Sequence, residues 1–228
     1  MTSGAPPVVS RSEWLAARVE LLAAEKEFTR QRDELNAARR TLPWVRVDAD
    51  YAFGTADGPR SLDQLFDGRE QLIVYHFMYG PTWTEGCPNC SFWADSYDGV
   101  VVHLANRNTS LVAVSRAPLA ALHAYRERMG WTFPWVSSLG TTFNEDYGVS
   151  NASTYNYAPV TDPMEESPGL SAFIRRDGEI FHTYSCYARG LDPFNSAYQL
   201  LDITALGRQE DDLPWPMAWL RRHDSYET

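Results

Sequence analysis

Residues 71–95 read QLIVYHFMYGPTWTEGCPNCSFWAD and carry three local signals in succession. The first eight of them, 71–78, are rich in β-branched and aromatic side chains, which is typical of a buried strand. Two glycines and a proline then predict a loop. Pro88 comes two residues after the second glycine and marks a helix N-terminus, so we expect a helix over about 87–105. The stretch therefore predicts a strand, a loop and a helix whose first turn carries a Cys-x-x-Cys pair.

The elements that follow the cysteines come in an order that defines a fold class. We expect, in chain order, a strand at 109–115, a helix at 119–129, an irregular insertion at 130–167, a hairpin of strands 170–176 and 179–186, and a helix at 194–203. Two strand–helix units followed by a hairpin and a final helix are the order of a thioredoxin fold. The sequence thus predicts an α/β, thioredoxin-like domain with a central mixed sheet flanked by helices.

The N-terminal residues predict one long helix over 10–42, opened by a capping box of Ser10 and Glu13. Large apolar residues recur along it every seven positions and form one stripe on an otherwise charged helix: Trp14, Leu21, Phe28, Leu35 and Leu42. We expect this stripe to pack on the chain's own domain or on a second copy in a homodimer. The predicted organisation is a helical extension, 1–42, and a thioredoxin-like domain, 43–228, with an insertion before its final hairpin.

Composition and charge narrow the range of partners. The chain has 228 residues, of which 44% are hydrophobic and 22% charged, and this is a globular composition. A formal net charge of −10 argues against nucleic acid and membrane surfaces as partners, because both require a basic surface. The sequence contains no run of 18 apolar residues and no secretory signal, so we expect no membrane span and a cytoplasmic location. There, a close pair of cysteines is redox-active or metal-binding rather than a structural disulfide.

Several common enzyme classes lack their motifs in this sequence. Lys26 is the only lysine and lies in a charged helical run, so there is no candidate for a Schiff-base lysine. The sequence contains no GxxxxGK, GxGxxG, HExxH or GxSxG motif. The cysteine pair is therefore the centre of any chemistry.

Position in the helix gives the two cysteines different properties. At the helix start, Cys87 faces unpaired backbone N–H groups and the positive end of the helix dipole, which favour the thiolate. Cys90 lies one turn further on and is close enough to resolve a mixed disulfide. We therefore expect Cys87 to attack and Cys90 to resolve. The residues alone leave two other interpretations open: two inert buried cysteines, or half of a metal site that needs two more ligands.

Six segments of the chain together resemble the uncharacterised DUF899 family: SRSEWLAAR, RSLDQLFDGREQLIVYHFMYGP, EGCPNCSFWAD, VAVSRAPL, MGWTFPWVSS and FHTYSCYARGLD. The resemblance covers about Ser10 to Asp224 and implies a thioredoxin-like fold distantly related to peroxiredoxins, with no established reaction. It places Cys87 and Cys90 on the CPxC positions of the family. It also implies a cis-proline at Pro168, before the hairpin, whose backbone binds an extended thiol substrate.

Other side chains are candidates for substrate binding. His182, Tyr184 and Cys186 alternate on the second hairpin strand, so we expect them to share one face. If that face opens towards the cysteine pair, His182 is a candidate acid–base group. Arg116 and Arg189 follow predicted strands and are candidates for holding a substrate anion or stabilising a thiolate.

Three functions fit these residues. The first is a thiol–disulfide oxidoreductase that acts without a cofactor on a protein disulfide or a small thiol. The second is a peroxiredoxin-like peroxidase, because Thr84 and Cys87 reproduce a Thr-x-x-Cys motif. The third is binding of copper or another soft metal by Cys87 and Cys90 together with His76 or His182.

Overall fold

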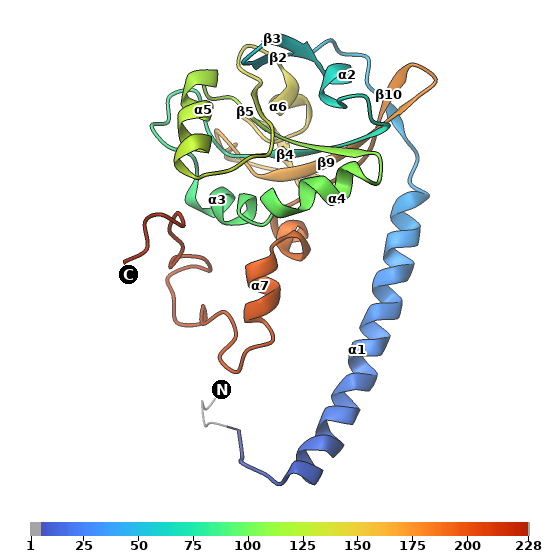
Figure 1. Ribbon diagram of the computed structural model, residues 1–228, viewed down its shortest axis with the longest axis vertical. Helices are drawn as coiled ribbons and strands as arrows, with labels where there is room; N and C mark the ends of the chain where they lie inside the picture. The colour runs from blue at the N-terminus through green and yellow to red at the C-terminus, as the bar shows by residue number, and fades with distance from the viewer. Residues whose placement is uncertain (1–5, 228) are drawn as a thin grey trace. The chain divides into compact units, whose positions relative to one another are not determined.

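Figure 1 shows the computed structural model of the chain, which describes residues 6–227. The chain divides into two compact units, Met1–Pro43 and Trp44–Thr228. In the first unit the long helix forms as α1 (Arg11–Arg40), with the predicted capping box between Ser10 and Glu13 at its start. No residue of α1 is buried. The apolar stripe is 45–65% exposed at Trp14, Leu21, Phe28 and Leu35.

The second unit is built on a mixed sheet of eight strands in the order β1–β10–β9–β4–β5–β6–β2–β3. The central strand β4 (Gln71–His76) pairs in parallel with β5 (Thr109–Ser115) and antiparallel with β9 (Gly169–Arg176). In turn, β9 forms the predicted hairpin with β10 (Glu179–Tyr187). These four strands are the ones predicted, and the α/β thioredoxin-like fold class is confirmed. The remaining strands are β1 (Val45–Arg46), β2 (Ala52–Thr55), β3 (Gly58–Ser61) and β6 (Trp135–Ser137).

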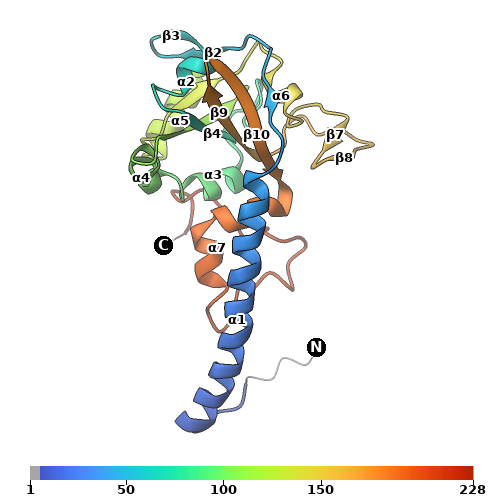
Figure 2. The same cartoon turned by 90° about the vertical axis from the view of Figure 1, so that its right-hand side faces the viewer.

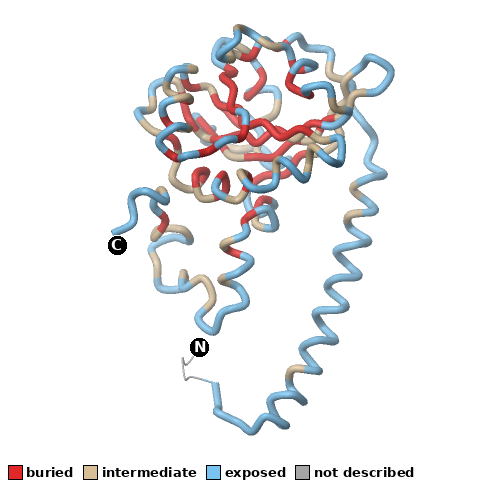
Figure 3. Tube along the Cα trace, viewed as in Figure 1, coloured by how far each residue is buried: buried red, intermediate tan, exposed pale blue. Residues whose placement is uncertain are grey.

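Alternate side chains of β4 enter two separate cores, one on each face of the sheet. Tyr75 and the adjoining Phe77 lie in a core with residues of α3 and α5, whereas Leu72 and Val74 lie in a second core. Figure 3 shows the buried residues concentrated in the central strands. The helices of this unit are α2 (Leu62–Leu65), α3 (Pro88–Ala94), η1 (Asp98–Val100), α4 (Val101–Ala105), α5 (Leu119–Arg128), α6 (Phe143–Asp146), η2 (Ala188–Phe194) and α7 (Ser196–Leu201). Across residues 6–227, no helix is both long and apolar enough to cross a membrane.

The segment 130–167 is more regular than the sequence predicts. Its first part forms β6, which extends the main sheet in parallel beside β5, and α6 follows. Two short strands, β7 (Thr154–Tyr155) and β8 (Ala158–Pro159), then form a separate hairpin (Figure 2). The short strand β6 escaped prediction because it is only three residues long and lies between Pro134 and Ser138, in a stretch whose proline, serine and glycine residues indicate a loop.

The helix expected over 87–105 is divided into α3, η1 and α4, so the expectation of one continuous helix is wrong. Two aspartates lie at the division and accept hydrogen bonds from the loop that follows α5. Trp131 Nε1 donates to Asp95 at 2.8 Å, and the backbone N–H of Thr132 donates to Asp98 at 2.5 Å. Asp and Gly have low helix propensity, so the sequence Asp98-Gly99 favours an interruption of the helix in the region where these bonds form.

Gly86 precedes the cysteines at a point where a side chain has no room. A Cβ there would lie 2.7 Å from Phe77 Cε1 and 3.1 Å from Tyr125 Cε1, whereas a Cβ at Gly99 would meet nothing within 4 Å. We predict that Gly86→Ala lowers the free energy of unfolding by about 1–3 kcal/mol, because two buried rings must move. The matched Gly99→Ala variant should stay within about 0.5 kcal/mol of the parent. Urea unfolding measures both, and equal stabilities of the two variants would contradict the packing described.

Candidate active site

Cys87 lies at the junction of the central strand and the helix that follows it. It is the N-cap residue of α3, which begins at Pro88, close to where the sequence predicts it. The backbone N–H of Cys87 donates to the carbonyl of Met78 at 3.0 Å and closes the intervening loop. The carbonyl of Cys87 accepts from the backbone N–H and the hydroxyl of Ser91, at 3.0 and 2.9 Å. The backbone of the cysteine is thus fixed on both sides.

The two thiols differ in acidity because their surroundings differ. The pKa of Cys87 is lowered to about 7 by a hydrogen bond from the Cys90 thiol, by the backbone N–H groups of Cys90 and Asn89, and by Arg222, against the opposing effect of burial. Cys90 is 2% exposed, and burial raises its pKa well above the usual value, with Cys87 adding to the rise. Near neutral pH the pair therefore holds a thiolate at Cys87 and a proton at Cys90.

Arg222 is a cation near this thiolate, and no motif or periodicity in the sequence singles it out. Its guanidinium donates to the Gly86 carbonyl and to the Tyr125 hydroxyl, both at 2.8 Å. It also pairs with Glu85 at 3.0 Å. Arg222 lies more than a hundred residues along the chain from the cysteines, in a segment with no helix or strand pattern, so only the tertiary structure brings it here.

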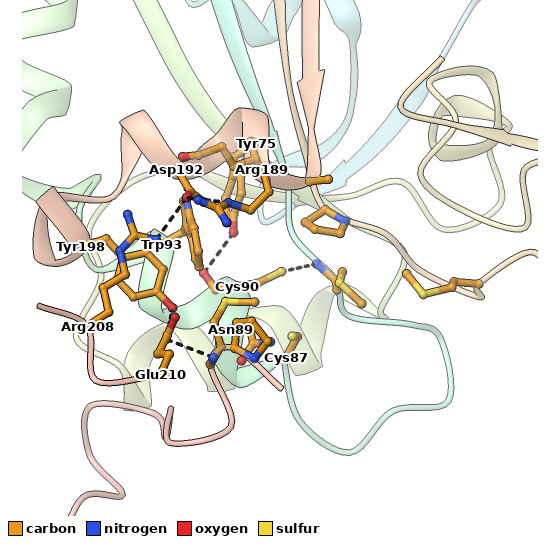
Figure 4. Close-up of a pocket in the computed structure, with 17 residues that line it drawn as sticks. Tyr75, Cys87, Asn89, Cys90, Trp93, Arg189, Asp192, Tyr198, Arg208 and Glu210 are labelled. Carbon is orange, nitrogen blue, oxygen red and sulfur yellow. Dashed lines mark hydrogen bonds and ion pairs between the residues drawn. The ribbon is translucent and has the colours of Figure 1, made fainter. Parts of the chain in front are cut away.

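A cavity of about 390 Å³ opens beside the cysteine pair (Figure 4). Cys87, Asn89 and Cys90 form one side of it. The other walls come from five parts of the second unit: the end of β4, α3, the loop that precedes β9, η2 with α7, and the C-terminal segment, residues 202–227. They contribute Tyr75, Met78, Trp93, Met164, Pro168, Ala188, Arg189, Leu191, Asp192, Tyr198, Arg208, Glu210, Pro216 and Met217.

Two of the expected substrate-binding residues line this cavity. Pro168 does so, but no peptide bond within residues 6–227 is cis, so the expected cis-proline is absent. The carbonyl of Pro168 accepts from the Tyr155 hydroxyl at 2.9 Å and is already engaged. Arg189 lies on the wall with its side chain 85% exposed and paired with Asp192 at 2.8 Å. Both residues therefore line the cavity, and their expected roles in substrate binding stay predictions.

Arg116, the second expected arginine, is committed elsewhere. It pairs with Glu166 at 2.7 Å, and the Glu166 side chain is only 1% exposed. Glu166 also accepts from the Ser150 hydroxyl at 2.8 Å. Arg116 does not line the cavity and compensates a buried carboxylate instead.

His182 and Tyr184 do not share a face, contrary to expectation. The pairing of β10 with β9 shifts register between them, so Thr183 is an extra residue and the alternation is broken. Tyr184 and Cys186 pack on the core that contains the cysteine pair. His182 instead contacts the rings of Tyr147 and Phe173, which belong to the other core.

His76 joins His182 through buried hydroxyls rather than through the cysteines. His76 Nε2 lies 2.8 Å from Ser171 Oγ, which lies 2.7 Å from Ser185 Oγ, and that oxygen lies 2.7 Å from His182 Nε2. Burial lowers the pKa of His76 to about 3 and also lowers that of His182. Both imidazoles are therefore neutral at pH 7. Residues 6–227 contain no group of three or more His, Cys, Asp or Glu side chains that could hold a metal ion.

The strand order and the position of the cysteine pair place the second unit in the thioredoxin-like class of α/β proteins. Within that class the chain belongs to the DUF899 family, described as bacterial proteins of unknown function, whose model matches residues 3–226. A search of curated proteins returned no match.

Among solved structures, the chain is similar to a peroxidoxin, BcpB, from Mycobacterium tuberculosis, with 16% identity and a TM-score of 0.47 over 70% of this chain and 97% of that one. It is also similar to peroxiredoxin Q from Xanthomonas campestris, with 12% identity and a TM-score of 0.45 over 72% and 98%. A hypothetical protein from Sinorhizobium meliloti 1021 gives 16% identity and a TM-score of 0.41 over 61% and 68%. The site described above rests on the geometry of this chain alone.

We predict that Arg222→Gln raises the pKa of Cys87 above 7, because the variant lacks the cation that favours the thiolate. Alkylation by iodoacetamide, followed over a pH series by peptide mass spectrometry, measures this pKa. Cys87 should react first in the parent, with a rate that rises as the pH passes through about 7. Arg221→Gln is the matched control, because the Arg221 guanidinium donates to the carbonyls of Ala218 and Leu220 and makes no bond to the cysteine loop within residues 6–227. An unchanged profile in Arg222→Gln would contradict the assigned role.

Proposed function

We propose that the protein is a thiol–disulfide oxidoreductase in which Cys87 attacks and Cys90 resolves. The thiolate of Cys87 attacks one sulfur of a disulfide R–S–S–R′ and releases R′–SH after protonation. The thiol of Cys90 then loses its proton and attacks the Cys87 sulfur, which releases R–SH and leaves a Cys87–Cys90 disulfide. The substrate gains two electrons and two protons, and an external dithiol returns the pair to the reduced state.

The observation that carries this proposal is the difference between the two thiols at one hydrogen-bonded site. Cys87 has a pKa of about 7 and lines the cavity. The buried Cys90 stays protonated, and its thiol donates a hydrogen bond to the Cys87 sulfur. A thiolate with a pKa near ambient pH combines ionisation with nucleophilicity. The neighbouring Cys90 stays unreactive until the mixed disulfide forms. A cytoplasmic setting, which we also propose, supplies dithiol reductants.

We predict that Cys90→Ser traps a mixed disulfide at Cys87, because the resolving sulfur is missing. The reduced variant is mixed with a small disulfide and analysed by intact and peptide mass spectrometry. In the variant an R–S group should replace the thiol hydrogen of Cys87. The parent should instead lose two hydrogen atoms as it forms the Cys87–Cys90 disulfide.

Cys87→Ser is the matched control and should form neither adduct nor internal disulfide. An adduct at Cys90, or no adduct in the folded Cys90→Ser protein, would contradict the proposal.

Metal analysis of protein purified without added metal tests the soft-metal alternative, in which stoichiometric copper or zinc would occupy the cysteines.

A peroxide is a second candidate oxidant, and Arg222 is the observation that favours it. The thiolate would attack the peroxide O–O bond to give a sulfenic acid and an alcohol or water, and Cys90 would then condense with the sulfenic acid and release water. A cation within reach of Cys87 polarises the peroxide, and Arg222 lies beside the Cys87 loop. Trapping of a sulfenic acid with dimedone in Cys90→Ser separates this reaction from disulfide exchange.

We also propose that α1 associates with α1 of a second copy. Its large apolar residues repeat every seven positions, which corresponds to the a positions of a heptad. Four flanking g–e pairs form between the helices of a parallel pair, and three of them are attractive: Glu13 with Arg18, Glu27 with Arg32 and Glu34 with Arg39 of the partner helix. An antiparallel pair would bring glutamates of the same flank together.

We predict that Phe28→Glu, at the centre of the stripe, converts a dimer into a monomer, because a charge cannot enter the apolar seam. Light scattering measures the mass over a range of micromolar concentrations. Val19→Glu is the matched control, since Val19 is similarly exposed but lies on the opposite side of the heptad. A monomeric parent protein, or a dimer that survives Phe28→Glu, would contradict the proposal.

A further inference from the structure

The cavity beside Cys87 is walled mainly by apolar side chains. Met78 and Trp93 lie on the side of β4 and α3, Leu191 belongs to η2, and Met164 and Met217 come from loops that are far apart in the sequence. Trp93 is fixed by a hydrogen bond from its Nε1 to the Leu191 carbonyl at 2.9 Å. Methionine side chains adapt to ligands of different shape. The walls therefore suit a group that needs apolar contact and little hydrogen bonding.

The charged residues of the cavity satisfy one another. Asp192 pairs with Arg189 at 2.8 Å and with Arg208 at 3.2 Å. Arg208 also pairs with Asp202 at 2.7 Å and stacks on the Tyr198 ring at 3.9 Å. Both arginines on the wall are thus paired with a carboxylate, which weakens their attraction for a carboxylate of a substrate.

Glu210, the other acid on the wall, is held in place by three hydrogen bonds to its Oε1. Its carboxylate accepts from the Tyr198 hydroxyl at 2.6 Å, from Trp219 Nε1 at 2.7 Å and from the Met217 backbone N–H at 3.0 Å. These bonds hold the C-terminal segment in place, so that Pro216 and Met217 form part of the wall. The two acids and two arginines on the wall cancel in charge, and the chain's net charge of −10 repels anions over a longer range.

We infer that this cavity binds an uncharged apolar group bonded to the sulfur that Cys87 attacks, so that the substrates are disulfides with an apolar body. The inference rests on the proposed function. The reactive sulfur of Cys87 and the apolar walls open on the same cavity, so a group R held there presents its sulfur to the thiolate. In the exchange, Cys87 bonds to R–S and the other half leaves as a thiolate, after which Cys90 releases R–SH and the pair becomes a disulfide.

The test uses mixed disulfides of n-alkyl thiols with 5-thio-2-nitrobenzoate. The aromatic half is the better leaving group and is the same in every substrate, and its release is coloured. Reduced protein, freed of reductant, is mixed with the methyl, butyl, hexyl and octyl members, and the second-order rate constant is measured. We expect the rate to rise with chain length by up to about fourfold per methylene that enters the cavity. The same series with 2-mercaptoethanol corrects for intrinsic reactivity, and glutathione disulfide should react slowly.

Met164→Glu tests the wall, because Met164 is 53% exposed and bonds to the rest of the fold through its backbone carbonyl. A carboxylate on the wall should lower the rates of the hexyl and octyl substrates more than that of the methyl substrate, and so flatten the dependence on chain length. Met164→Leu is the matched control and should keep the parent dependence. Circular dichroism of both variants checks that they fold alike.

The outcomes separate this inference from the proposed function. If every disulfide, including the methyl one, fails to react at Cys87, the proposed function fails. If all react but the rate is independent of chain length, or glutathione disulfide reacts fastest, the function stands and the apolar cavity is not the substrate site. If the rate rises with chain length equally in Met164→Glu, the alkyl group binds elsewhere and the inference is overturned.

Discussion

The contact between Met78 and the cysteine helix is the constraint on which the site depends. Met78 follows the central strand, and its carbonyl accepts from the Cys87 N–H at 3.0 Å while its N–H donates to the Cys90 sulfur at 3.4 Å. The backbone of this one residue is thus hydrogen-bonded to both cysteines. The Tyr75 hydroxyl adds a bond to the Cys90 carbonyl at 3.1 Å. β4 is rigid because it is paired on both edges and buried on both faces. The bonds from Met78 and Tyr75 therefore hold Cys87 and Cys90 in fixed positions.

The C-terminal segment completes the site although it has almost no regular secondary structure. Side-chain bonds hold this segment in place. Arg222 donates to the Gly86 carbonyl of the cysteine loop, Asp224 pairs with Arg128 at 2.6 Å, and His223 lies 2.7 Å from Asp95. Ion pairs of partly exposed residues contribute little singly, and the packing of Trp219 and Met217 on the core adds apolar burial. The segment is therefore held by many weak contacts and is the part of the site most easily displaced.

The fold and the position of the cysteine pair could be predicted from the sequence, because both depend on local signals. The apolar run of β4, the loop glycines and Pro88 fix a strand, a turn and a helix start within 25 residues, and the cysteines occupy that start. The cavity could not be predicted in the same way. Its walls come from residues as distant as Met78 and Met217, and a pairing such as Tyr198 with Glu210 leaves no periodic trace. The bulge at Thr183 also broke an alternation that the sequence alone presents as regular.

Arg222 and Met217 belong to the same segment but act on different properties of the site. Arg222 favours the thiolate of Cys87, and Met217 forms a wall of the cavity in which a substrate would lie. Displacement of the segment would therefore remove the cation and the wall together, so that the pKa of Cys87 would rise as the cavity opens. The reverse also follows from linkage: a ligand that packs against Met217 stabilises the segment, keeps Arg222 beside Cys87 and thereby favours the thiolate. Under the proposed function, substrate binding and activation of the nucleophile would be coupled through residues 217–222.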